Sequence, residues 1–136
     1  MGTVVVYWSG SGNTQALAEA VSGGVKAAGG SCDIFAADKI SAAKAAAYDK
    51  LLLGCPAMGA EELEGDIFEP FYGALEKLIK GKTVGLFGSY GWGGGEWMEI
   101  WQKRAEAFGI NVAAVLPVNE SENGTEDAIA FGKKFA

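Results

Sequence analysis

The chain has 136 residues, of which 49% are apolar and 21% charged, so one globular domain is expected and a disordered tail or coiled coil is excluded. Seventeen acidic against eleven basic residues leave a net charge of −6, which argues against nucleic acids and anionic membranes as partners and favours basic proteins. Histidine is absent, which excludes Ser-His-Asp, Cys-His and His-metal chemistry.

Five short apolar runs are predicted to form β-strands. The first run combines three valines with Tyr7 and Trp8 and ends at a Ser-Gly pair, which is typical of a buried strand. The fifth run contains Pro117, where we expect the strand to break. The strands are predicted at residues 3–8, 32–36, 50–55, 83–88 and 111–118.

The segments between these runs carry helical patterns. Ser41 is placed to cap a short Ala-rich helix. Asp66 and Glu69 are spaced like a capping box, in a segment whose apolar side chains fall at intervals of four. The helices are predicted at residues 14–28, 41–48, 66–79, 97–108 and 125–136.

Regular alternation of strands and helices predicts an α/β domain with a parallel sheet covered on both faces. We expect residues 1–136 to form one domain, because no linker or repeat interrupts the pattern. No apolar run approaches the ~18 residues that span a bilayer, and no basic residue precedes the first run as in a signal peptide. Cys32 and Cys55 form no CxxC motif and fit two buried free thiols, so we expect a cytoplasmic protein.

The loops after the first, third and fourth strands are the candidate site, because ligands of open parallel sheets bind beyond the carboxyl ends of strands. The first loop consists of Ser9, Gly10, Ser11, Gly12, Asn13 and Thr14. Its glycines, its neutral donors and the helix that follows suit a compact terminal phosphate, whereas a nucleoside-triphosphate loop requires Gly-Lys-Ser/Thr. The alternative is a tight turn that only caps the helix.

The other two loops offer surfaces for a flat ring. The second contains Pro56, Ala57, Met58, Gly59, Ala60 and Glu61, and the third contains Ser89, Tyr90, Gly91, Trp92 and Gly93. Trp92 belongs to no helical or strand stripe, so it either stacks on a planar heterocycle or packs locally. Met58 is a polarisable surface for such a ring, although a Met in this position can also cover the core. A phosphate at one end and a large planar ring at the other describe flavin mononucleotide (FMN).

Three stretches resemble the short-chain flavodoxins, bacterial electron carriers that hold one FMN. They are YWSGSGNT at 7–14, LLLGCPAMGAEELE at 51–64 and GLFGSYGWGGGEWM at 85–98. Their order and spacing agree over essentially the whole chain, and no insertion splits the fifth strand as in the long-chain type. The resemblance implies a flavodoxin-like three-layer sandwich, with helices on both faces of a five-stranded parallel sheet of order 2-1-3-4-5.

The resemblance also implies roles for individual residues. Residues 9–14 would hold the FMN phosphate, with Ser89 nearby. Met58 and Trp92 would lie on opposite faces of the ring, and the Glu61 carboxylate would accept a hydrogen bond from the ring N3–H.

Main-chain groups are implied as well. Backbone N–H groups around Tyr90, Gly91 and Gly93 would contact the pyrimidine edge of the ring. The Gly59–Ala60 peptide would turn over when the ring takes one electron. If the turned form is a type II turn, Ala60 needs a positive φ, which costs about 1 kcal/mol for a residue with a Cβ. Ala60→Gly should then raise the first reduction potential.

The function implied is a low-potential one-electron carrier that has no substrate turnover of its own and binds no metal. An uncharged phosphate cradle leaves the negative charge of the phosphate in place, so adding further charge to the ring is unfavourable. Neighbouring acids should add to this field, namely Glu61, Glu62, Glu64, Asp66 and Glu69. We expect a monomer that meets redox proteins through their basic docking surfaces.

Three other functions share this architecture. A flavin-dependent quinone reductase would need a second substrate pocket, for which these loops are short. A ribonucleotide-reductase-activating partner is chemically close to the carrier, but the pair of Met58 and Trp92 fits the carrier better. A response-regulator domain needs an aspartate at the end of the third strand, where this chain has Gly54, Cys55 and Pro56.

Overall fold

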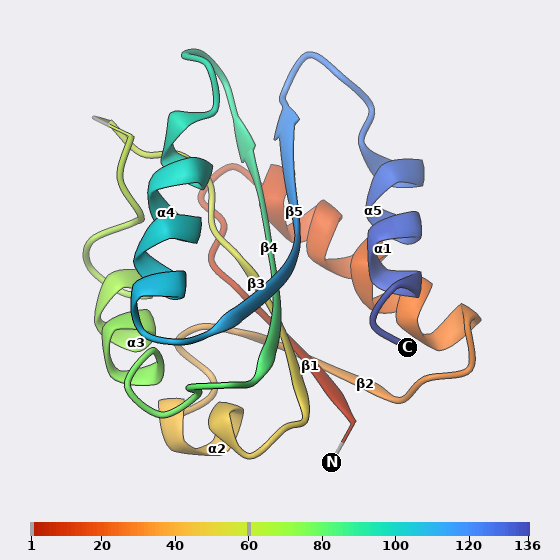
Figure 1. Cartoon of the computed structure of the whole chain (residues 1–136). Helices are drawn as coiled ribbons and strands as arrows, with labels where there is room; N and C mark the ends of the chain where they lie inside the picture. Colours follow the sequence, from red (N-terminus) through yellow and green to blue (C-terminus); the bar gives the residue numbers. More distant parts are fainter. Residues whose placement is uncertain (1, 60) are drawn as a thin grey trace.

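A single parallel sheet forms the centre of the protein, as shown by a computed structural model that describes residues 2–59 and 61–136 (Figure 1). The sheet has the order β2-β1-β3-β4-β5, which confirms the order implied by the family resemblance. Because every pairing is parallel, the carboxyl ends of all the strands lie at one edge. The strands are β1 (Thr3–Tyr7), β2 (Cys32–Ala36), β3 (Lys50–Gly54), β4 (Thr83–Tyr90) and β5 (Asn111–Asn119).

Helices cover both faces of this sheet, which confirms the three-layer sandwich (Figure 1). One face carries α1 (Asn13–Ala27) and α5 (Thr125–Lys133), which pack against each other. The other carries α2 (Ala42–Ala46), α3 (Phe68–Leu75) and α4 (Glu96–Ala107). Ser41 caps α2 as predicted, since its Oγ accepts a hydrogen bond from the Lys44 N–H at 3.2 Å. Within the described residues, no helix has the length and apolar character needed to cross a membrane.

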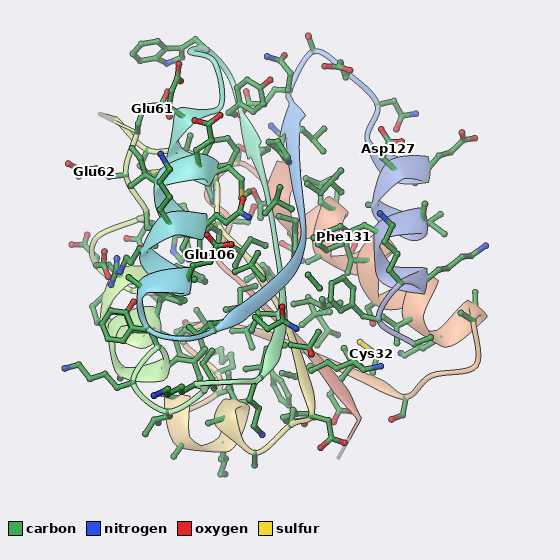
Figure 2. The ribbon with its side chains drawn as sticks, in the orientation of Figure 1. Cys32, Glu61, Glu62, Glu106, Asp127 and Phe131 are labelled. Atoms are coloured by element: carbon green, nitrogen blue, oxygen red, sulfur yellow. The ribbon has the colours of Figure 1, made fainter. Side chains whose placement is uncertain are left out.

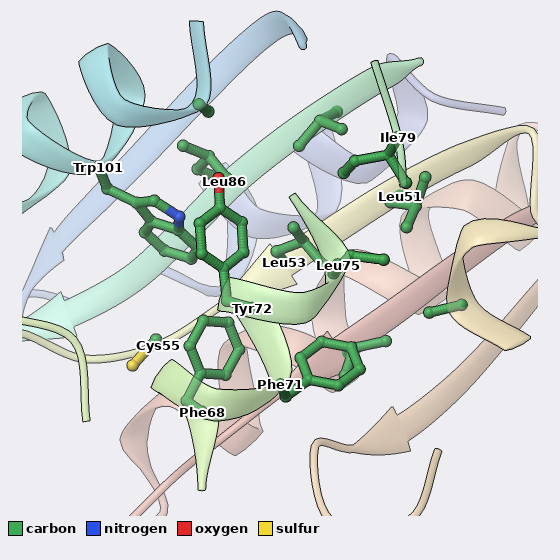
Figure 3. Close-up of a cluster of buried hydrophobic side chains, with 14 of the residues drawn as sticks. Leu51, Leu53, Cys55, Phe68, Phe71, Tyr72, Leu75, Ile79, Leu86 and Trp101 are labelled. Atoms are coloured by element: carbon green, nitrogen blue, oxygen red, sulfur yellow. The ribbon is translucent and has the colours of Figure 1, made fainter. Parts of the chain in front are cut away.

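The central strands are apolar at consecutive positions because they supply both layers of the core. In β1, Val4 and Val6 pack toward α3 and α4, whereas Val5 packs toward α1 and α5, and all three are fully buried. The larger core cluster is aromatic, and the Tyr72 ring lies edge-on to Trp101 at a centroid distance of 5.7 Å (Figure 3). This packing fixes α3 and α4 against the sheet.

Helices α1 and α5 approach each other closely enough for their backbones to touch. A Cβ on Gly24 would overlap the carbonyl of Ile129, and a Cβ on Gly132 would overlap the carbonyl of Val21. Gly in a helix interior costs about 1 kcal/mol relative to Ala. Glycine is nevertheless needed at position 24, because a side chain there would block the packing of α1 onto α5.

Strand β5 continues through Pro117, so the predicted break is wrong. Pro117 lies opposite Gly88 in the register with β4, and β5 is the edge strand of the sheet. A proline is tolerated on an edge strand because its missing N–H leaves no partner unpaired on the outer side. The irregularity of this pairing lies elsewhere, between Val84 and Gly85.

Helix α3 is shorter than the predicted 66–79 and has a different cap. Glu64 caps it, and the Asp66–Glu69 capping box does not form: Glu64 Oε2 accepts from the Asp66 N–H at 2.8 Å, and Oε1 accepts from the next two N–H groups at 2.8 and 2.7 Å. Burial alone would raise the pKa of Glu64, but the three N–H donors outweigh it and lower that pKa below its ordinary value. The charged carboxylate therefore holds the segment that leads from the second site loop into α3.

Candidate functional site

The first site loop is shaped around the amino end of α1. Gly12 precedes the helix with a φ of +98°, a conformation that glycine adopts without steric cost. Its N–H donates a hydrogen bond to Ser9 Oγ at 3.0 Å. No side chain caps the first turn of α1, so its N–H groups and the positive end of the helix dipole are open toward the loop. This donor set suits a phosphate.

Buried hydroxyl groups connect this loop to the sheet. Thr14 Oγ1 lies 2.9 Å from Ser89 Oγ, and the Ser89 N–H donates to Thr14 Oγ1 at 3.4 Å. Both residues are buried. The structure therefore places Ser89, at the end of β4, beside the first loop.

The second loop is a tight turn closed by reciprocal backbone hydrogen bonds. The Met58 N–H donates to the Glu62 carbonyl at 2.9 Å, and the Glu62 N–H donates to the Met58 carbonyl at 3.0 Å. Gly59 has a φ of +39° and Glu61 a φ of +60°. Ala60, to which the type II turn argument applies, lies outside the described residues. A positive φ costs on the order of 1 kcal/mol at a residue with a Cβ, so this turn carries strain at Glu61.

The Glu61 side chain fastens the second loop to α4. Its Oε2 accepts a hydrogen bond from the Trp97 N–H at 3.0 Å, and a Cβ on Gly93 would come within 2.5 Å of its Oε1. Glu96 lies beside it, with a pKa lowered by its own backbone N–H and by the Gly94 N–H, which donates to Glu96 Oε2 at 2.9 Å. The Glu61 side chain therefore accepts a hydrogen bond from the first turn of α4, a role that the resemblance did not imply.

The third loop leaves an indole uncovered. Trp92 is 80% exposed, whereas Trp97 and Trp101 are almost completely buried. The cleft between the second and third loops, lined by residues that include Ala57 and Gly91, measures about 30 Å³. That is roughly the volume of one water molecule. A three-ring heterocycle would therefore lie here only with the two loops further apart, and the bare face of Trp92 suits stacking on it.

The remaining predicted residues bring the loops together at one edge of the sheet. The Ala57 N–H donates to the Ser89 carbonyl at 3.0 Å, so the second loop, which starts at Pro56, runs along the end of β4. The Tyr90 ring packs on Trp97 at a centroid distance of 5.4 Å, and the Tyr90 carbonyl accepts a hydrogen bond from the Glu120 N–H at 2.9 Å.

Sequence reasoning missed the segment that follows β5. Asn119 pairs with Tyr90 in the register, and Asn119 and Glu120 line a cavity of about 150 Å³ together with Asn13 and Ser89. The predicted topology already implied this position, because the fifth strand of a parallel sheet must end at the same edge as the other strands.

The chemistry of these groups fits FMN. Neutral hydroxyl and N–H donors at a helix amino end match a phosphate, and an exposed indole matches a flat ring. Met58 is 37% exposed and is not among the residues that line the cleft beside Trp92. Across residues 2–59 and 61–136, no group of three or more His, Cys, Asp or Glu side chains is placed to hold a metal ion. The fold and the site together define an FMN-binding protein of the three-layer sandwich class.

The comparisons with known proteins identify the family. The chain matches the Flavodoxin family over residues 5–132. It is 46% identical over 132 residues to the flavodoxin of Megasphaera elsdenii, covering 97% of this chain and 96% of that protein. It is 40% identical over 134 residues to the flavodoxin of Clostridium beijerinckii, covering 97% of both. The solution structure of the two-electron reduced M. elsdenii flavodoxin superimposes with a TM-score of 0.89 at 45% identity, covering 96% of both chains.

The chain therefore belongs to the flavodoxin family. Its function is electron transfer with FMN, without turnover of a substrate of its own. Its partners are redox proteins.

Proposed function

We propose that residues 9–14 hold the FMN phosphate and that Met58 and Trp92 enclose the ring. When bound, FMN supplies one-electron redox chemistry. The observation that carries this assignment is that an uncapped helix amino end, after β1, and an 80% exposed Trp92, after β4, lie at the same edge of the sheet. The Glu61 carboxylate, which accepts from the Trp97 N–H through Oε2, would accept from a ring N–H through Oε1.

The proposed carrier has a low potential because its site lacks compensating positive charge. No Lys or Arg occurs in the three site loops, so the charge of a bound phosphate stays unneutralised. Glu69, expected to add to the negative field, instead forms a bidentate ion pair with Arg104 at 2.7 Å. The field at the site comes from nearer acids, Glu61 and Glu62 among them, and it opposes further negative charge on the ring.

We propose a monomer that meets basic surfaces of its redox partners. The support is the net charge of −6 together with exposed acids beside the site loops, among them Glu62, Glu96 and Glu120. Analytical ultracentrifugation should give the mass of one chain, and electron transfer to a basic partner should slow as salt is added.

We also propose that residues 1–136 act as one domain in the cytoplasm. Both core clusters share the single sheet, which supports one cooperative unit. Cys32 and Cys55 are free and buried, and burial raises the pKa of Cys55 to about 12, so both thiols suit a reducing compartment. Calorimetry should show a single unfolding transition, which tests the single domain. Cell fractionation should recover the protein in the cytoplasm, which tests the location.

A reductive titration of the purified protein tests the assignment. The yellow protein should take up electrons in two separate one-electron steps, and a colourless protein that ignores added FMN would overturn the proposal. Trp92→Ala should weaken FMN binding about tenfold, since stacking on an aromatic side chain contributes about 1–3 kcal/mol. Trp92→Phe keeps an aromatic face and is the matched control.

A further inference from the structure

A groove lies beside the ring cleft, between residues 61–63 and the outer face of α4. It measures about 140 Å³, and Trp97, Trp101, Leu63 and Ile100 supply its apolar lining. Glu61 lines both this groove and the cleft next to Trp92, so the two adjoin at this residue. Figure 2 shows Glu61 and Glu62 beside the amino-terminal part of α4. Anything seated in the groove would therefore adjoin the site of electron transfer.

The groove presents uncovered apolar surface. Ile100 projects from α4 and is 56% exposed, although its helical neighbours Trp97 and Trp101 are buried. Half-exposed aliphatic side chains are common on protein surfaces. Ile100 differs because it lines a cavity that shares Glu61 with the cleft beside Trp92.

The groove is also acidic, because the Arg104 guanidinium is already paired with two carboxylates. Arg104 donates two hydrogen bonds to Glu69, both at 2.7 Å, and two to Glu76, both at 2.9 Å. Its guanidinium carbon also lies 4.9 Å from the centre of the Tyr72 ring. Four of the five N–H bonds of an arginine are thus used. Glu61 and Glu62 face no comparable cation among the lining side chains.

The walls of the groove are held in place at both ends of α4. Glu61 binds the Trp97 N–H near the amino end, and Arg104 binds Glu69 and Glu76 near the carboxyl end. A partner that docks in a groove held in this way loses little free energy to reorganisation.

We propose that this groove receives a Lys or Arg side chain of a redox partner, together with an apolar neighbour of that side chain. The inference rests on the proposed function and adds the place where the partner docks. A cationic head matches the carboxylates of Glu61 and Glu62, and its methylene stem matches Ile100 and Leu63. The partner's redox centre is thereby brought beside the cleft between the second and third loops.

Stopped-flow electron transfer tests the apolar half of the proposal. The probe is cytochrome c, a basic haem protein, mixed with the reduced holoprotein. Ile100→Ser should lower the second-order rate about fivefold, because partial burial of the side chain is lost. Leu78→Ser, which removes a side chain that is 53% exposed and lies outside the groove, is the matched control and should change the rate by less than twofold. Equal rates for the two variants would overturn the proposal.

The charged half is tested with Glu62→Gln against Glu126→Gln, each compared at its own measured reduction potential. Glu126 lies in the first turn of α5, across the sheet, so both variants make the same change in net charge. Glu62→Gln should slow the reaction about threefold at low salt and have no effect at high salt. Equal effects of the two variants would show that only net charge matters, which contradicts a specific docking groove.

Methyl NMR of the unmutated protein gives an independent test. Redox-inactive zinc-substituted cytochrome c should shift the Ile100 methyl signal and leave that of Ile129, on the opposite face of the sheet, unchanged. A shift of the Ile100 signal with protein concentration alone would show that a second copy fills the groove, and would overturn the proposal. Reduction of a small uncharged quinone by the reduced holoprotein distinguishes failure of the carrier function from failure of the docking site. Loss of this reaction contradicts the carrier function itself. A normal rate, together with cytochrome c kinetics that do not depend on the groove, contradicts only the docking site.

Discussion

The phosphate side and the ring side of the site are built on different principles. On the phosphate side, the open groups are backbone N–H donors at the start of α1, and Gly12 supplies the positive φ without strain. The supporting hydroxyl pair of Thr14 and Ser89 is buried. On the ring side, the surfaces are side chains, Trp92 is largely exposed, and the positive φ falls on Glu61.

This difference indicates a division of labour. In the proposed site, a main-chain cradle fixed by buried hydrogen bonds would define where the cofactor is anchored, and it should change little with the surroundings. Side chains on strained turns can shift at small energetic cost, so they are suited to respond to the charge on the ring. Affinity for the phosphate and the reduction potential should therefore respond to different mutations.

The largest effect is expected from the scaffold beneath the ring side. Arg104→Gln should lower the free energy of unfolding by about 3 kcal/mol, because the Glu76 carboxylate, only 5% exposed, loses its cation. Urea denaturation of the apoprotein measures this. Lys103→Gln, on the exposed face of the same helix, is the control and should change stability by less than about 0.5 kcal/mol. Similar values for both variants would mean that the ion pair does not support the loops.

The next effect is expected at the phosphate side. Thr14→Val leaves the Ser89 hydroxyl without its partner, and an unpaired buried polar group costs about 1–3 kcal/mol. FMN binding should weaken by about 10- to 100-fold in a fluorescence titration. Riboflavin, which lacks the phosphate, should bind equally to the variant and the parent. Parallel losses for both ligands would contradict the division between the two sides.

A smaller, pH-dependent effect is expected at the cap of α3. The pKa of Glu64 is lowered in the folded protein, so its charged form stabilises the fold above the ordinary carboxyl pKa of about 4.3, and this contribution is lost as the pH falls through the lower folded-state value. Glu64→Gln should cost about 1 kcal/mol at pH 7 and nothing at low pH, measured by thermal unfolding across pH. Asp66→Asn should show no such trend. A constant difference between Glu64→Gln and the parent would refute the cap.

The smallest effect is expected in the second loop. Ala60→Gly should raise the first reduction potential by roughly 40 mV, which corresponds to about 1 kcal/mol for one electron. Spectroelectrochemistry measures it, with Ala57→Gly as the control outside the turn. An unchanged potential would place the responsive strain at Glu61, where the positive φ is observed.

The fold was largely predictable because the patterns that define its strands and helices lie within short segments of the sequence. Alternating strand and helix patterns set the order of elements, and the rule for ligands of parallel sheets pointed to the loops that contain Thr14 and Ser89. The strand through Pro117 was mispredicted because a sequence does not show which strand will lie at an edge.

Much of the site scaffold was not predictable because its contacts join distant positions. The bond from the Trp97 N–H to Glu61 spans 36 positions, and that from Arg104 to Glu69 spans 35. The cap of α3 is local but was assigned to the wrong acid, because the spacing of a capping box does not reveal that Glu64 is buried against the helix start.

The close contact between α1 and α5 bears on how the fold assembles. Helix α1 gains its backbone-to-backbone neighbour only when Ile129 and Gly132 of α5 pack against it. A chain in which α5 has not docked exposes one side of α1 to solvent. Because these contacts join segments far apart in the sequence, docking of α5 costs loop-closure entropy and should be a late step of folding.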